Sequence, residues 1–134
     1  MQQVDRDFFA TNGFFNLGQV LDKSEVDYFL DLFNGDMSTH PYFWHDYGYH
    51  QYANYEALIT SPRFDELIRH ARIFPLIESL MGGALCFGEI GLRLMRAYDG
   101  LLHQGWHRDK PHWEEHPLRM DYIQLMVYLS DVDE

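Results

Sequence analysis

One short stretch of the sequence holds residue types that can bind a metal together. The segment QGWHRDKPHW, residues 104–113, contains His107 and Asp109 with one residue between them. On an extended backbone, residues i and i+2 project to the same side, so this imidazole and this carboxylate can reach a single cation. An imidazole and a carboxylate are two of the three ligands in the facial triad of non-haem Fe(II) oxygenases. The pair therefore predicts half of a metal site.

The tripeptide alone is weak support for that site. H-x-D arises by chance in many proteins, and a loop histidine that is hydrogen-bonded to its neighbours is the simpler explanation. The surrounding pattern favours a metal. Alternating side chains predict a strand over residues 91–98, a turn follows at Asp99-Gly100, and residues 122–129 alternate again. A double-stranded β-helix presents its metal site in this order along the chain: a strand, a turn, the H-x-D pair and a second strand.

The chain before this segment predicts the helices that would position it. Helical spacing, capping residues and glycine or proline stops support each one. The expected elements are a helix over 4–11 that ends at Asn12-Gly13, a brief strand over 14–17, an amphipathic helix from the capping box of Asp22 and Glu25 to Asn34-Gly35, a helix that begins at Ser61-Pro62, and a helix from Pro75 to Met81. Helices followed by an antiparallel sheet indicate an α+β domain or a helix-decorated β-sandwich.

Two further segments are less specific. Residues 40–55, HPYFWHDYGYHQYANY, are dense in aromatic residues and histidine without a clean period, which predicts a loop or short strands. They would either line a pocket or pack as a surface loop. Cys86 lies in the apolar run ALCF, so we interpret it as a buried, inert thiol.

The composition excludes several classes of partner. The chain has 134 residues, 46% of them hydrophobic, which suits one globular domain. Its 10 basic and 21 acidic residues give a net charge of −11, which opposes binding to nucleic acid or to an anionic membrane. A single cysteine fits a reducing compartment, and the N-terminus MQQVDRDFF lacks a signal-peptide pattern. We therefore expect a cytoplasmic protein.

Four stretches together resemble the N-terminal part of the phytanoyl-CoA dioxygenase family, whose members are Fe(II)- and 2-oxoglutarate-dependent oxygenases. They follow the family's order and cover nearly the whole chain: FFATNGFFNLGQVLDKSEVDYFLDLF, SPRFDELIRHARIFPLIESLMGG, GWHRDKPHW and YIQLMVYLSDVDE. The resemblance implies an α+β fold in which N-terminal helices pack on a partial double-stranded β-helix, or jelly roll. Residues 1–134 would form one domain, the incomplete N-terminal part of such an oxygenase.

The resemblance also implies site residues. His107 and Asp109 would be the first two Fe(II) ligands, and an aspartate at that position favours hydroxylation of a small molecule over halogenation. Met126 matches a position beside 2-oxoglutarate by register, and Gln124 on the same face would share that role. The substrate pocket would be lined by Trp106, Trp113 and Tyr128. Ordinary sheet packing explains each of these five equally well, and the nearby His103, His112 and His116 are read as surface or supporting residues.

The chain departs from the family after residue 134. The family's distal histidine, and the arginine that pairs with the 2-oxoglutarate carboxylate, lie on later strands, and no arginine follows Arg119 here. Whether this chain is an enzyme is left open. It could be the front part of a longer protein, a short relative that completes its site with His112, His116 or a second copy, or a non-catalytic remnant. We expect little or no turnover, and homo-oligomerisation through exposed sheet edges.

Two functions from other classes compete with the oxygenase. A binding or assembly domain could keep the fold without the site, although the presence of both His107 and Asp109 argues against it. A cupin-like metal protein that does not use 2-oxoglutarate is the other. Cupins present closely spaced histidines and a later glutamate, and the long helical segment before the sheet is foreign to them.

Overall fold

The computed structural model describes residues 6–97, 100 and 122–131. Among these residues, the chain forms helices and one small antiparallel sheet. The mixed helix and strand content expected from the sequence is therefore confirmed. The elements in chain order are α1 (Arg6–Asn12), α2 (Lys23–Thr39), η1 (Pro41–Phe43), β1 (His45–Asp46), β2 (Gln51–Asn54), α3 (Ala57–Thr60), η2 (Pro62–Phe64), α4 (Asp65–Ile68), α5 (Phe74–Met81) and β3 (Leu92–Met95).

The longest helix, α2, begins as predicted but ends later. The Asp22 side chain accepts from the backbone N–H of Glu25 at 2.9 Å, and the Glu25 carboxylate accepts from the N–H of Asp22 at 2.8 Å. This is a complete capping box. The predicted stop at Asn34-Gly35 is wrong. A glycine inside a helix costs only about 1 kcal/mol, and the buried side chain of Asp36 holds the following turn in place.

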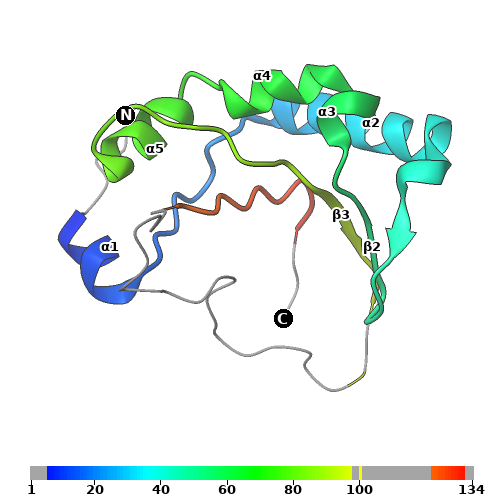
Figure 1. Ribbon diagram of the computed structural model, residues 1–134, viewed down its shortest axis with the longest axis horizontal. Coiled ribbons are helices and arrows are strands. Elements are labelled where there is room, and N and C mark those ends of the chain that lie inside the picture. The colour runs from blue at the N-terminus through cyan, green and yellow to red at the C-terminus, as the bar shows by residue number, and fades with distance from the viewer. Residues whose placement is uncertain (1–5, 98–99, 101–121, 132–134) are drawn as a thin grey trace.

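Helices α1 and α5 are bounded by the glycine and proline residues that the sequence predicted. α1 stops at Asn12 and Gly13 takes a φ of 77°, while α5 carries a proline in its first turn and ends at Gly82 with a φ of 75°. These left-handed glycines end helices without a steric penalty. α1 lies beside α5, away from the other helices (Figure 1), and the Arg6 guanidinium donates to the Ser79 carbonyl at 2.6 Å.

The helix expected after Ser61-Pro62 is shorter than its pattern suggests. Pro62 does open the first turn, but the chain forms η2 and then a single turn, α4, which ends at Ile68. The Ser61 side chain does not cap this helix. It donates instead to Asp36 at 2.6 Å, so a tertiary contact has replaced the local one.

The three strands form one antiparallel sheet in the order β1-β2-β3. His45 lies opposite Ala53, and Ala53 lies opposite Arg93, so the three residues form a row across the sheet. The next row joins Tyr52 to Leu94. Short strands within residues 40–55 and a strand within 91–98 were both predicted, and both are confirmed with narrower bounds.

The core lies between helices α2, α3 and α4 and one face of the sheet, and the helices gather at one end of the strands (Figure 1). Leu92 belongs to the core, and its neighbours on that face, Tyr52 and Leu94, pack against it. Phe64 has the largest fully buried side chain among the described residues, and it stacks on Phe29 with ring centroids 6.3 Å apart. The buried apolar residues of the cluster are Leu21, Phe29, Phe33, Trp44, Ala57, Phe64, Leu67, Ile73 and Leu92.

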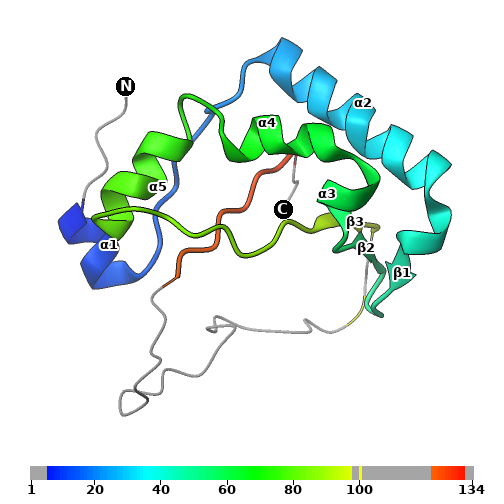
Figure 2. The same ribbon diagram turned by 45° about the horizontal axis from the view of Figure 1, so that its top comes forward.

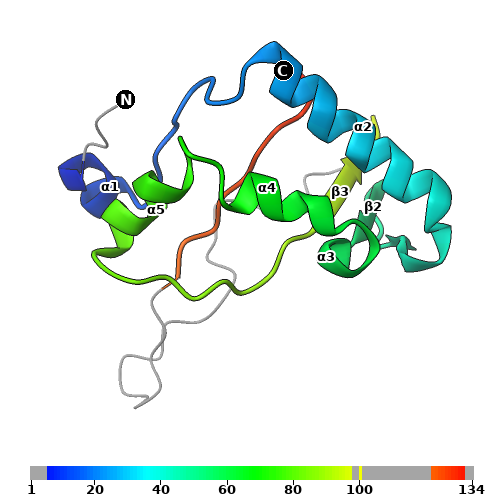
Figure 3. The same ribbon diagram turned by 90° about the horizontal axis from the view of Figure 1, so that it is seen from above.

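Two segments expected as strands, residues 14–17 and 122–129, join no sheet among the described residues. In Figures 2 and 3, residues 122–131 run from the side of α1 and α5 toward α2 and α4. Cys86 is exposed, so the expectation of a buried thiol is wrong. Its segment has no paired neighbour to cover it among the described residues, and adjacent Phe87 is 48% exposed.

None of the helices in the described ranges combines the length and the apolar character needed to cross a bilayer.

Candidate functional site

The predicted metal pair lies outside the described residues. His107 and Asp109 fall in residues 101–121, as do Trp106 and Trp113, and the same holds for His103, His112 and His116. Their assignment therefore stays a prediction. The structure describes the elements on either side: β3, which precedes the pair in the sequence, and residues 122–131, which follow it.

Residues 122–131 follow the predicted alternation only in part, because Leu125 is 40% exposed. Val127 and Leu129 are partly buried and pack against the core, whereas Met126 is 63% and Tyr128 is 66% exposed. Gln124 is also exposed. That Gln124, Met126 and Tyr128 share one face stays a prediction. Whether it contacts a co-substrate or a substrate stays a prediction.

Within the described ranges, no group of three or more histidine, cysteine, aspartate and glutamate side chains is arranged to hold a metal ion. His50, in the aromatic segment, is near a backbone carbonyl instead, with its Nδ1 2.6 Å from the Ala97 oxygen. Asp46 accepts from the backbone N–H of Gly48 at 2.7 Å and so stabilises the turn between β1 and β2. Asp46 thus supports the turn between β1 and β2, and His50 connects the start of β2 to the chain after β3.

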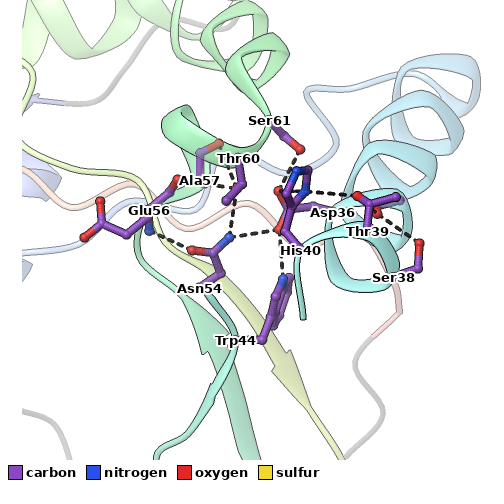
Figure 4. Close-up of polar contacts among 11 residues, drawn as sticks. Asp36, Ser38, Thr39, His40, Trp44, Asn54, Glu56, Ala57, Thr60 and Ser61 are labelled. Carbon is purple, nitrogen blue, oxygen red and sulfur yellow. Dashed lines mark hydrogen bonds and ion pairs between the residues drawn. The ribbon is translucent and has the colours of Figure 1, made fainter. Parts of the chain in front are cut away.

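The most concentrated polar cluster surrounds Asp36 of α2, which is 1% exposed (Figure 4). One carboxylate oxygen accepts from the Trp44 indole N–H and from the Asn54 amide, each at 2.8 Å. The other accepts from the Ser61 hydroxyl at 2.6 Å. These partners come from the loop before β1, from β2 and from the turn after α3. A single buried carboxylate therefore joins α2 to the sheet and to the next helices.

The cluster holds the pKa of Asp36 below its ordinary value of 3.8. Burial alone would raise this pKa, because it disfavours the charged form. The hydrogen bonds to the carboxylate outweigh burial, and they come from Ser61, Thr60, Asn54 and Trp44. Asp36 is therefore ionised at neutral pH, and both of its carboxylate oxygens accept hydrogen bonds from buried or partly buried donors, which makes it a structural anchor and not an acid–base catalyst.

The sequence carries a signal for this cluster in the position of Asp36 on its helix. Asp36 follows Phe29 by seven residues and Phe33 by three, so it lies on the buried stripe of the helix. An acid on such a stripe must be paired or hydrogen-bonded, because burying it alone is costly. The expected helix stop at Gly35 hid this position.

A second acidic group, Glu25, links the start of α2 to the segment before α5. Its carboxylate is 3.0 Å from the His70 ring nitrogen Nε2 and also contacts the Arg72 guanidinium. The hydrogen bond from His70, followed by that from the Asp22 backbone, lowers the pKa of Glu25. Like the Asp36 cluster, this group connects segments that are distant in the sequence.

The face of the sheet that points away from the core carries two tyrosines over a small residue. Tyr47, Ala53 and Tyr55 alternate onto this face, and the two rings meet edge to face with centroids 5.3 Å apart. Ala53 is only 1% exposed although it lies outside the core cluster. Tyr47 and Tyr55 remain 50% and 39% exposed.

Arg93 lies on the same face, directly opposite Ala53. Its guanidinium Nη2 donates to the Tyr55 hydroxyl at 2.8 Å. The Tyr55 ring rests on Gly91, where a Cβ would lie 2.8 Å from the ring carbon Cδ1. Glycine is thus required for this ring position, which in turn sets the hydroxyl beside the guanidinium.

Comparison of the chain with protein-family models, with curated proteins and with solved structures found no match.

Proposed function

We propose that this chain is part of an Fe(II)- and 2-oxoglutarate-dependent hydroxylase of the phytanoyl-CoA dioxygenase type, which acts on a small molecule. The observation that supports the proposal is the position of His107 and Asp109. They follow β3, which is antiparallel to β2, and they precede the alternating residues 122–131. In this proposal β3 and residues 122–131 belong to a jelly-roll sheet covered by the described helices.

The donor types fit iron. A neutral imidazole and a carboxylate, separated by one residue, suit a divalent first-row metal that keeps open positions. The bound metal would supply oxygen activation at the expense of 2-oxoglutarate. His107 and Asp109 would hold it, and Gln124 and Met126 would lie along the co-substrate. Trp106, Trp113 and Tyr128 would exclude water and orient the substrate.

An anaerobic titration with Fe(II) in the presence of 2-oxoglutarate tests the proposal. We expect a weak visible charge-transfer band that saturates with added iron. Replacing His107 or Asp109 with Ala should remove the band and weaken metal binding at least about tenfold, since even partners that only support a ligand are worth that much. Relaxation enhancement by Mn(II) in place of iron gives the affinity without relying on the band.

The control is His103→Ala, which removes a histidine of the same segment outside the H-x-D pair. It should keep both the band and the affinity. Far-ultraviolet circular dichroism establishes that each variant folds. Metal binding that is unchanged in the folded His107→Ala and Asp109→Ala variants would contradict the proposal. It would leave an assembly domain or a different metal protein as the better reading.

A further inference from the structure

We propose that Arg93 and Tyr55 form a seat for the carboxylate or phosphate group of a small anionic ligand on the outer face of the sheet. The seat goes beyond the proposed hydroxylase, since none of its residues is a metal or co-substrate residue there. The following observations support it.

Arg93 lacks the carboxylate partner that four of the seven described basic residues have. Four of the described basic residues contact a carboxylate: Lys23 contacts Asp27, Arg63 contacts Glu66, Arg69 contacts Asp65 and Arg72 contacts Glu25. Arg93 contacts no carboxylate among the described residues, and neither do Arg96 and Arg6, whose guanidinium donates to Ser79. Its exposed guanidinium is hydrogen-bonded to a neutral phenol instead. The positive charge is therefore available to an external anion.

Arg93 and Tyr55 have further N–H and O–H groups that can donate hydrogen bonds to that anion. A guanidinium has five N–H groups in a planar fork, and the contact with Tyr55 accounts for one of them. The Tyr55 oxygen accepts this bond, so its own O–H is left to donate. Planar guanidinium groups bind carboxylates and phosphates through two parallel hydrogen bonds. Arg93 and Tyr55 together present adjacent donors of the kind that such a group requires.

The sheet fixes these donors in place. Tyr55 is held by Gly91 beneath its ring, by the edge contact with Tyr47 and by Arg93 itself. Arg93 lies within β3, and its row across the sheet continues through Ala53 to the exposed His45. An imidazole at the far end of this row can contact a second polar group of the ligand. The seat therefore favours a small molecule with one acidic group and a nearby polar group.

Nuclear magnetic resonance of the ¹⁵N-labelled full chain tests the seat without iron. Inorganic phosphate and glutarate are titrated separately, with chloride at matched ionic strength as the reference. We expect saturable shifts of the Arg93 side-chain Nε–H and of the Ala53 and Tyr55 amides. The anion that binds more tightly identifies the acidic group, phosphate or carboxylate, and saturable binding of either supports the seat.

Three variants separate a seat from a merely structural pair. Arg93→Gln should weaken binding at least about tenfold, because a hydrogen bond to a charged group contributes about 1.5 to 3 kcal/mol. Tyr55→Phe should weaken it several-fold. Gly91→Ala, which displaces the Tyr55 ring but keeps both side chains, should also weaken it. The matched control is Arg69→Gln, which removes an arginine that already contacts Asp65 and should change nothing.

Shifts that do not saturate, or that chloride reproduces, would overturn the seat. Saturable binding that survives Arg93→Gln in a folded chain would also overturn it. If Arg93→Gln does not fold, Tyr55→Phe and Gly91→Ala decide the question by the same criterion. Because no metal is present, failure of this titration leaves the metal proposal untouched, and failure of the iron titration leaves the seat untouched.

Discussion

Replacing Asp36 with Ala is expected to lower the free energy of unfolding by about 3 kcal/mol or more. The change leaves three donors without their acceptor, on Trp44, Asn54 and Ser61, where Asp36 itself is 1% exposed. Each buried group that loses its partner costs about 1 to 3 kcal/mol. Urea denaturation followed by circular dichroism measures the loss.

Two further variants show whether the carboxylate is the cause. Asp36→Asn keeps one acceptor oxygen and should cost less, about 1 to 2 kcal/mol. Asp31→Ala removes an exposed aspartate from the same helix and should change the free energy of unfolding by less than about 0.5 kcal/mol. If Asp36→Ala were as stable as Asp31→Ala, the cluster would not anchor the fold.

The free energy of unfolding should also depend on pH through the ionisation of Asp36. The pKa of Asp36 is lower in the folded chain than its ordinary value of 3.8. The folded state therefore binds fewer protons than the unfolded state near that pH, and stability increases with pH there. The contribution of Asp36 is complete above about pH 5 and is lost as the pH falls through its folded pKa.

Asp22 and Glu25 also have lowered pKa values and contribute in the same range of pH. The difference between the wild-type chain and Asp36→Asn isolates the contribution of Asp36. This difference in unfolding free energy should shrink toward zero between pH 5 and the folded pKa of Asp36. A difference that stays constant with pH would mean that the charge of Asp36 has no part in it.

Replacing Phe64 with Ala is expected to cost about 3 to 5 kcal/mol, the usual loss for a fully buried phenylalanine. Phe64 is 1% exposed and stacks on Phe29, so the deletion leaves a cavity between α2 and the η2 turn. Domains have a total stability of about 5 to 15 kcal/mol, so the variant should be near the limit of folding.

The matched control for Phe64 is Phe87→Ala, which deletes the same side chain where it is 48% exposed. It should change the denaturation midpoint little. Both variants and the wild type are compared at the same protein concentration, so that any self-association affects them equally. Equal midpoints for Phe64→Ala and Phe87→Ala would show that the helices do not share the core described above.

Local chemistry in the sequence predicted the end of α1, the start of α2 and both ends of α5. The capping box at Asp22 and Glu25, the glycines at 13 and 82 and the proline at 75 act through neighbouring backbone atoms, so they can be read without the fold. The end of α2 and the role of Ser61 could not be read in this way. Both depend on Asp36, whose partners come from segments up to 25 residues away.

The strands were predicted from the alternation of their side chains, and this pattern does not identify which strands pair. Of the predicted inward residues, Val127 and Leu129 are partly buried but Leu125 is 40% exposed. Residues 122–129 join no ladder among the described residues, because pairing requires a partner that the pattern itself does not specify. Cys86 was misjudged for the same reason, since an apolar run is buried only where something covers it. The outer face of the sheet, with Arg93 opposite Ala53, became visible only through the register.

The Asp36 cluster also determines how the molecule opens. The last turn of α2 follows Gly35, where a helix would ordinarily fray, and its Ser38 and Thr39 hydroxyls bond back to the Gly35 carbonyl. Asp36 ties this turn to segments on both sides of the hairpin. The turn can therefore open only when those contacts break together. Its amides should exchange with solvent in one cooperative unit with β2, more slowly than the amides of the short α1.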